Sequence, residues 1–176
     1  KFMIGLLTAM GNVGVYHIGK NVSYMVFSFM TALENVFRPE IYRRMFDQED
    51  QNITSIGDYL VPFLYISIGM AMLVALFSEE VFNVLTPEAY WGAAPVVTIL
   101  SMYFGLLFFG KIYSVQLIYS KKTYLNTVLV ISSVVINILL NIPMIMWFGA
   151  VGAAWATMVA GVLSGLIGIT VAQRII

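Results

Sequence analysis

The sequence predicts an all-α protein, namely a polytopic bundle of transmembrane helices. Three observations predict this class. Hydrophobic residues make up 60% of the 176 residues and charged residues only 10%, whereas a soluble domain is about 25% charged. The mean hydropathy is +0.89. Apolar runs of about 20 residues, the length of a helix that crosses a bilayer, recur along the chain, so we expect about five complete spans and a partial first helix.

The first helix is expected to be incomplete, because only about ten apolar residues precede Gly11, roughly half of a bilayer-spanning helix. The chain is therefore expected to be a fragment that begins inside a membrane helix. Proline and glycine mark where the later helices begin or end. A short interfacial helix is expected over 79–85. The expected spans are, in order, about 1–11 (partial), 12–37, 59–78, 91–118, 123–147 and 149–172.

The basic residues predict the orientation of the bundle. They cluster in alternate connections, whereas the connection 78–91 and the turn at 148–149 hold none. The positive-inside rule places basic connections in the cytoplasm. The predicted cytoplasmic segments are therefore 38–57, 119–123 and the C-terminus. Their basic residues are Arg38, Arg43, Arg44, Lys121, Lys122 and Arg174.

Composition argues against several classes of function. The formal net charge is zero, so the chain lacks the basic surface that binds nucleic acid. It has no cysteine and a single histidine, His17, which excludes disulfides and thiolate-ligated metals and argues against a histidine zinc site. We predict no cofactor, no metal site and no catalytic residue.

The span 12–37 carries a polar stripe along its whole length. At about 100° per residue, the stripe stays within about 40° of one line, and Lys20 lies at its edge. Because unpaired polar groups are costly in hydrocarbon, we expect the stripe to face a water-accessible cavity, with hydrogen bonding between helices as the alternative. The stripe consists of His17, Asn21, Tyr24, Ser28, Thr31 and Asn35. The opposite face, which suits lipid, holds Val22, Val26, Phe29, Met30 and Leu33.

The last two spans show two further patterns. A second polar line in span 123–147 consists of Thr123, Asn126, Ser133, Asn137 and Asn141. Pro143 removes a backbone hydrogen bond near the outer end of this line and so predicts a kink. In span 149–172, small residues recur at four-residue spacing, at Ala153, Thr157, Gly161 and Gly165. Such a line lets a neighbouring backbone approach closely, so we expect a packing surface without chemistry.

Lys111 interrupts the apolar run 106–118. At 1.5 Å per residue it lies about 15 Å from Lys121 and about 30 Å from Trp91, which places it in the inner half of the membrane. Two interpretations stay open: its ammonium group snorkels toward the headgroups, or it is a functional charge that faces an aqueous path.

Three stretches together resemble one family of membrane transporters. They are "KFMIGLLTAMGNVGVYHIGKNVSYM" (1–25), "FFGKIYSVQLIYSKKT" (108–123) and "NIPMIMWFGAVGAAWAT" (141–157), in which Asn-x-Pro precedes a short turn and Gly-x-x-Gly-Ala-Ala-x-Ala-Thr. In order and spacing they are similar to the polysaccharide and lipid-linked oligosaccharide (O-antigen-type) flippases of the multidrug/oligosaccharidyl-lipid/polysaccharide exporter superfamily. The resemblance covers essentially the whole chain, as the C-terminal half of such a protein.

The resemblance implies two six-helix bundles around a central cavity that opens to alternate sides of the membrane. It implies that the chain works with an N-terminal half of the same protein, in the cytoplasmic (inner) membrane of a bacterium. The implied substrate is an undecaprenyl-pyrophosphate-linked oligosaccharide, which is flipped for surface polysaccharide biosynthesis. The coupling ion, a proton or sodium, stays open.

The same resemblance supplies candidate site residues, because the family often places basic residues in the cavity. Lysines can neutralise a pyrophosphate as mobile point charges. We hypothesise that Lys111, Lys20 and Lys1 form the anion-binding set. Amide and hydroxyl groups can hydrogen-bond sugar hydroxyls. The residues expected to line the path are Asn21, Tyr24, Asn137 and Asn141.

Three alternatives stay open. An ion-coupled multidrug or metabolite exporter of the same superfamily would carry acidic residues inside the bundle, where the chain offers only Glu34. An intramembrane enzyme acting on lipid-linked sugars would need paired carboxylates near a histidine, whereas Glu79, Glu80 and Glu88 suit a solvated connection. A purely structural bundle is disfavoured by the two polar stripes.

Overall fold

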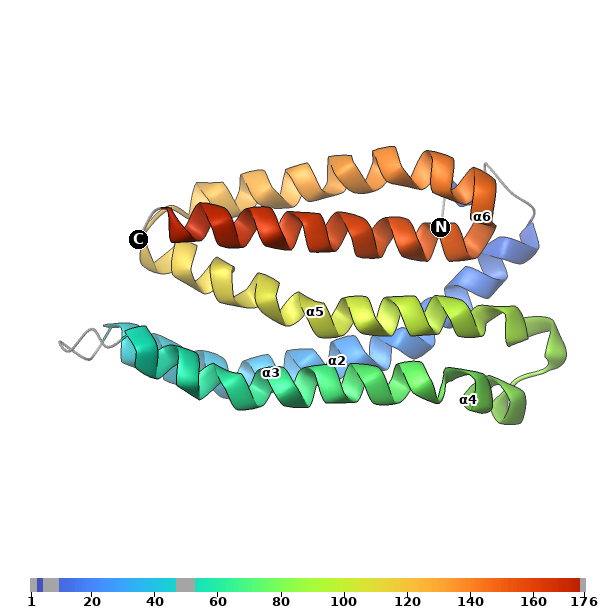
Figure 1. The fold of residues 1–176 in the computed structure, drawn as a ribbon, viewed down its shortest axis with the longest axis horizontal. Helices are drawn as coiled ribbons and strands as arrows, with labels where there is room; N and C mark the ends of the chain where they lie inside the picture. Colours follow the sequence, from blue (N-terminus) through green and yellow to red (C-terminus); the bar gives the residue numbers. More distant parts are fainter. Residues whose placement is uncertain (1–2, 5–9, 47–52, 175–176) are drawn as a thin grey trace.

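The computed structural model describes residues 3–4, 10–46 and 53–174 (Figure 1). The elements of these residues are all helical, which confirms the predicted all-α class. In chain order they are α2 (Met10–Phe46), α3 (Ile53–Leu76), α4 (Ser78–Leu85), the 3-10 helix η1 (Glu88–Ala93), α5 (Ala94–Tyr119) and α6 (Thr123–Gln173).

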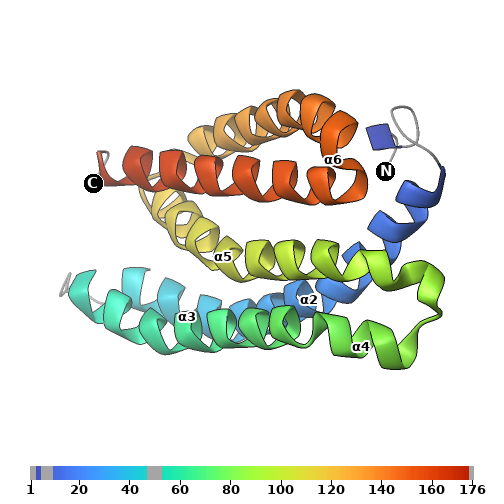
Figure 2. The same cartoon turned by 45° about the vertical axis from the view of Figure 1, so that its right-hand side comes forward.

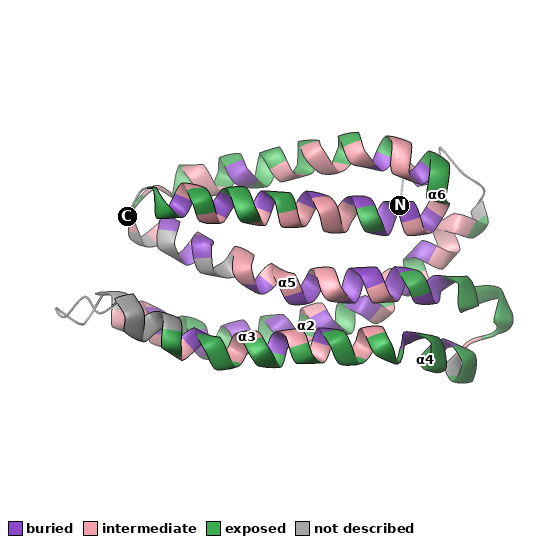
Figure 3. Ribbon diagram, in the orientation of Figure 1, coloured by how far each residue is buried: buried purple, intermediate pink, exposed green. Residues whose placement is uncertain are grey.

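Helix α5 is the centre of the bundle. It packs against α2 and α3 on one side and against α6 on the other, and both ribbon views show it between these two layers (Figure 1, Figure 2). In the apolar 18-residue stretch of the segment that contains α5, 56% of the residues are buried, against 17% in the corresponding stretches of α3 and α6. Figure 3 shows exposed residues along α3 and α6, so these helices offer apolar surface to lipid or to further protein.

Helix α6 consists of two antiparallel arms joined at Gly149, a first arm (123–148) and a second arm (150–173) (Figure 1). Gly149 has φ 56° and ψ −129°, a backbone conformation that glycine adopts readily because it has no Cβ. The turn lies where the sequence predicts it. Gly149, and not Pro143, is the residue of α6 with non-helical dihedral angles, so the glycine makes the reversal.

The helices are long and apolar enough for a multi-pass membrane protein. Within the described part of the chain, three segments meet both conditions: Asp58–Leu76, Glu88–Val115 and Thr123–Gln173, the last of which contains both arms of α6. Helix α2 is not among these three although it has 37 residues, and it is the helix that carries the polar stripe. The C-terminal ends of α2, α5 and α6 lie together at one end of the bundle, here called the basic end, opposite Gly149 (Figure 1).

Helix α2 runs on through Pro39 to Phe46, whereas the sequence predicts that the span ends at Arg38-Pro39. Phe37 and Ile41, on either side of the proline, are both 2% exposed. Both side chains belong to the main hydrophobic core, so tertiary packing on each side of the proline holds the helix together against the cost of about 3 kcal/mol for an internal proline.

Ion pairs also support the extension of α2 beyond Pro39. The Glu40 carboxylate accepts hydrogen bonds from Arg43 Nη2 and from Arg44 Nε, both at 2.8 Å. These hydrogen bonds, from Arg43 first and Arg44 second, lower the pKa of Glu40 from 4.5 to about 2. The folded pKa thus lies below the unfolded pKa, so the stabilisation is fully present above about pH 4.5 and is lost as the pH falls toward about 2.

Glu40→Gln is therefore expected to lower the thermal unfolding midpoint slightly at about pH 6, where wild-type Glu40 is ionised in both states. The difference between variant and wild type is expected to shrink at about pH 3. Thermal unfolding of the full-length protein in detergent at the two pH values tests this. An unchanged difference would contradict the role of the Glu40 charge.

The prediction that one face of α2 lies against lipid is wrong. Val26 and Met30, on that face, are only 0% and 5% exposed and belong to the main hydrophobic core. The polar stripe is instead the exposed side of the helix: each of its six residues is exposed. Lipid and a protein interior are equally apolar, so periodicity alone cannot show which of the two an apolar face will contact.

The predicted packing line of the second arm of α6 is buried at Ala153, but the line that is buried along its whole length lies one residue earlier. The buried line consists of Gly152, Ala156, Ala160, Ser164, Gly168 and Ala172. A Cβ on Gly168 would lie 2.7 Å from the Tyr113 ring of α5, so this line allows close approach. In the predicted line, Gly161 also allows close approach, because a Cβ there would lie 2.1 Å from Tyr103 Cε2, whereas Thr157 is half-buried and a Cβ on Gly165 would meet nothing within 4 Å.

Helix α4 occupies the position of the short helix predicted over 79–85. Phe82 is fully buried, whereas Glu79 and Glu80 are exposed. The Ser78 and Thr98 hydroxyls lie 2.8 Å apart and hydrogen-bond each other, which links the start of α4 to α5.

Candidate functional site

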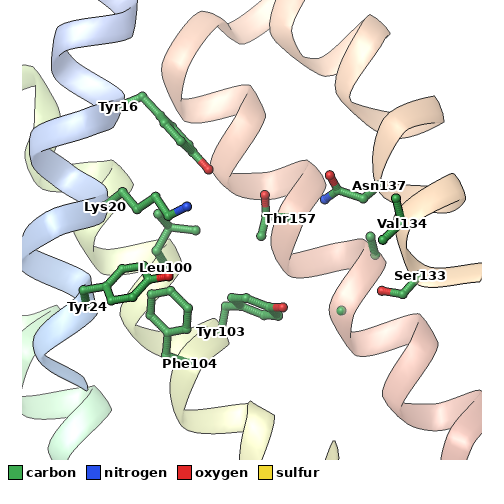
Figure 4. Close-up of a pocket in the computed structure, with 12 residues that line it drawn as sticks. Tyr16, Lys20, Tyr24, Leu100, Tyr103, Phe104, Ser133, Val134, Asn137 and Thr157 are labelled. Atoms are coloured by element: carbon green, nitrogen blue, oxygen red, sulfur yellow. The ribbon is translucent and has the colours of Figure 1, made fainter. Parts of the chain in front are cut away.

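A cleft of about 390 Å³ lies between α2, α5 and both arms of α6. Three residues of α2 line it, at four-residue spacing: Tyr16, Lys20 and Tyr24. Because residues four apart share one face of a helix, the side chains stand one above another on the wall of the cleft (Figure 4). The Lys20 ammonium lies 5.5 Å from the centroid of the Tyr24 ring, within the range of a cation–π interaction.

Helix α5 supplies the floor of the cleft through Leu100, Tyr103 and Phe104. The Phe104 ring contacts two other rings of the cleft, at centroid distances of 5.5 Å to Tyr24 and 5.3 Å to Tyr103. Gly161 of α6 makes room for Tyr103, because a Cβ there would lie 2.1 Å from Tyr103 Cε2. The glycine thus lets the Tyr103 ring reach from α5 to the second arm of α6.

The wall opposite α2 comes from α6 and carries three polar side chains among its six lining residues. Ser133 and Asn137 belong to the first arm and Thr157 to the second. Asn141 Nδ2 donates hydrogen bonds to Asn137 Oδ1 and to the Asn137 carbonyl oxygen, both at 2.8 Å. This pair of bonds holds the Asn137 amide in place, with the NH2 group available to donate to a molecule in the cleft.

One end of the cleft lies near the Gly149 turn. A Cβ on Gly149 would lie 3.1 Å from Asn12 Nδ2, and Tyr16, one turn further along α2, points its hydroxyl toward Thr157 (Figure 4). Helices α2 and α6 therefore meet at this end, while Lys20 lies deeper in the bundle.

The charge in the cleft is Lys20. Among side chains that the structure describes inside the predicted spans, Lys20 is the one cation. It lies eight residues from Asn12, which is about 12 Å along the helix axis, so its charge lies well inside the bundle. Lys20 is half-buried, and its ammonium points into the cleft (Figure 4).

The buried acidic residue of α2 lies outside the cleft and forms an ion pair. Glu34 is 6% exposed and forms an ion pair with Arg38, one turn further along α2. No group of three or more metal-ligating side chains lies close together among the residues that the structure describes.

The structure brings together some of the predicted site residues and separates others. Lys20, Tyr24 and Asn137 all line the cleft. Asn141 is buried and does not line the cleft itself, but its hydrogen bond orients the Asn137 amide. Asn21 is exposed and does not line the cleft. Lys1 and the side chain of Lys111 lie outside the described residues, so their roles stay predictions.

Sequence reasoning missed Tyr16, Tyr103 and Thr157 as lining residues. Tyr16 precedes Lys20 by four residues, a spacing that could have indicated a shared face. Thr157 was assigned to packing alone. Tyr103 carried no signal, because a single tyrosine in an apolar helix is compatible with core or lipid positions alike.

Comparisons with known proteins identify a flippase as a relative. The chain is 27% identical over 156 residues to the "Probable low-salt glycan biosynthesis flippase Agl15" of Haloferax volcanii, a match that covers 88% of this chain and 33% of the relative. The chain thus spans about a third of the length of the relative. No protein-family model and no solved structure matches the chain.

Proposed function

We propose that the chain is part of a membrane transporter that flips a lipid-linked glycan from one leaflet of the membrane to the other. The observation that carries this proposal is a lysine in a polar cleft well inside a membrane bundle, in a chain related to a glycan biosynthesis flippase. The finer proposal, from the sequence resemblance, is an undecaprenyl-pyrophosphate carrier, an N-terminal half that completes the cavity, and a cytoplasmic basic end.

The proposed mechanism follows from the chemistry of the cleft. A phosphate group and a glycan cannot cross about 30 Å of hydrocarbon unaided, but polar walls can hold them while the lipid tail stays in the bilayer. Lys20 pairs with the anionic group of the substrate, with Lys111 and Lys1 as proposed further members of the anion-binding set. Ser133 and Asn137 offer hydrogen bonds to hydroxyl groups, and the Thr157 hydroxyl, which donates to the Ala153 carbonyl oxygen at 2.9 Å, can accept one.

Three observations favour this function over its alternatives. An ion-coupled exporter needs an acid that gains and loses a proton or binds an ion, whereas the buried acid here, Glu34, is ion-paired with Arg38. An enzyme would need a carboxylate pair, whereas Glu79, Glu80 and Glu88 are all exposed. The relative is named as a flippase, which is a transporter and not an enzyme.

Lys20→Ala is expected to reduce the rate of translocation at least tenfold, because a hydrogen bond to a charged group contributes about 1.5–3 kcal/mol. The measurement uses the full-length protein in proteoliposomes with a fluorescently labelled lipid-linked glycan. Lys20→Arg, which keeps the charge, is expected to retain part of the rate.

Lys122→Ala is the control, because it removes a lysine from the connection between α5 and α6, outside the cleft. We expect it to leave the rate unchanged. Normal translocation by Lys20→Ala at an equal amount of folded protein would show that Lys20 does not hold the substrate.

A further inference from the structure

We infer that the aromatic platform (Tyr24, Tyr103 and Phe104) binds the apolar face of a sugar ring in the transported glycan. This inference rests on the proposed function and names the part of the substrate that the cleft recognises. It assigns sugar recognition to the rings, and recognition of the anionic group beside the sugar to Lys20.

The three rings contact one another in a row. Phe104 lies between the other two, edge-on to Tyr24 at an interplanar angle of 67° and tilted by 42° to Tyr103. Such ring pairs stabilise each other by about 0.5–1.5 kcal/mol beyond the area that they bury. The platform is therefore held in shape before any ligand enters.

The platform is accessible from the cleft. Tyr24 is 43% exposed and Tyr103 is half-buried, whereas Phe104 is 7% exposed. Tyr24 and Tyr103 therefore offer surface to a ligand, and Phe104 lies between them and contacts both rings (Figure 4).

Two different chemistries face each other across the cleft. The platform lies on α2 and α5, whereas the hydroxyl and amide groups of Ser133, Asn137 and Thr157 lie on α6 (Figure 4). A sugar ring is amphipathic in the same way, because its C–H groups form an apolar face and its hydroxyls project from the rim. The C–H face packs on the electron-rich faces of aromatic rings, while the rim hydroxyls reach donors and acceptors.

The size and charge of the cleft limit which part of the substrate it can bind. Its volume of about 390 Å³ is near the lower end of small-molecule sites, about 300–1,000 Å³, so it suits a sugar unit with its neighbouring charged group and not a whole glycan. Lys20 lies next to the platform, 5.5 Å from the Tyr24 centroid. Its anionic partner is either the pyrophosphate of the carrier or an acidic group on the sugar.

The test measures binding of two lipids to the full-length protein in nanodiscs. One probe is undecaprenyl pyrophosphate without sugar, and the other is the lipid-linked glycan extracted from cells that express the protein. Tyr24→Leu and Phe104→Leu remove a ring but keep a bulky apolar side chain. Each is expected to weaken binding of the glycan-bearing lipid about tenfold and to leave binding of the bare carrier unchanged.

Two further variants sharpen the test. Tyr24→Phe keeps the ring without its hydroxyl, so it is expected to bind the glycan-bearing lipid much more tightly than Tyr24→Leu does. Tyr65→Leu is the control outside the cleft, because Tyr65 lies on α3 and is 72% exposed. We expect it to bind both lipids like the wild type.

The outcomes separate this inference from the proposed function. If the ring variants weaken binding of both lipids equally, or of neither lipid, the platform does not recognise the sugar. This conclusion holds even if the wild type still translocates the glycan. A wild type that does not translocate the glycan overturns the proposed function itself. If Lys20→Ala weakens binding of both lipids, the anionic partner of Lys20 is the pyrophosphate. If it weakens binding of the glycan-bearing lipid alone, the partner is an acidic group on the sugar. Unchanged binding of both lipids overturns the role of Lys20.

Discussion

Gly152→Ala is expected to destabilise the protein by about 3 kcal/mol or more, at the upper end of overpacking effects. A Cβ on Gly152 would lie 1.9 Å from the Met144 carbonyl oxygen and 3.1 Å from the Phe148 side chain. Met144 and Phe148 belong to the first arm of α6, so the clash lies between the two arms. The closest atom is a backbone atom and cannot move aside by side-chain rotation.

Gly165→Ala is the matched control for this prediction. Gly165 lies on the same arm, and a Cβ there would meet nothing within 4 Å, so alanine is expected to be neutral or stabilising by up to about 1 kcal/mol through its helix propensity. Thermal unfolding and folded yield of the full-length protein in detergent provide the measurement. Equal stability of the two variants would show that the arms do not pack at Gly152.

Gly161→Leu is expected to block transport, because the new side chain would occupy the cleft. Its Cβ would lie 2.1 Å from Tyr103 Cε2, so the Tyr103 ring must leave its position. Overpacking costs about 1–3 kcal/mol, and the lost space also excludes substrate from the platform. We expect the translocation rate in proteoliposomes to fall at least about tenfold.

Two variants separate blocked transport from misfolding. Gly165→Leu adds the same side chain one turn further along the arm, where space is open, and is expected to transport normally. Gly161→Leu with Tyr103→Ala gives leucine the room of the lost ring, so it should recover stability without recovering transport. Normal transport by Gly161→Leu at wild-type folded yield would place the substrate path elsewhere.

The sequence alone predicted part of the site, and it did so through helical periodicity. Lys20 and Tyr24 were placed on or beside one polar line and Asn137 on another, and the structure brings all three to one cleft. Periodicity succeeds here because residues three and four apart share a face in any α-helix, whatever surrounds it. It failed for Asn21, which lies on the same stripe but outside the cleft.

Several features could not be read from the pattern. Tyr103 became a lining residue because α5 crosses Gly161 of α6, a contact between segments far apart in the sequence. In the predicted packing line of α6, Ala153 is buried, whereas the line that is buried along its whole length lies one residue earlier. Small residues occupy both lines, so the sequence does not show which line is buried. The rotation of the helix about its axis against α5 determines this.

The sequence by itself determined the helical class, the reversal at Gly149 and the polar lines, because these follow from composition, local backbone preference and the period of the helix. The tertiary structure alone decided which apolar faces are buried and which side chains meet in the cleft. The physical reason is that lipid and protein interior are both apolar, so the hydrophobic pattern does not choose between them. Close contacts between helices make that choice.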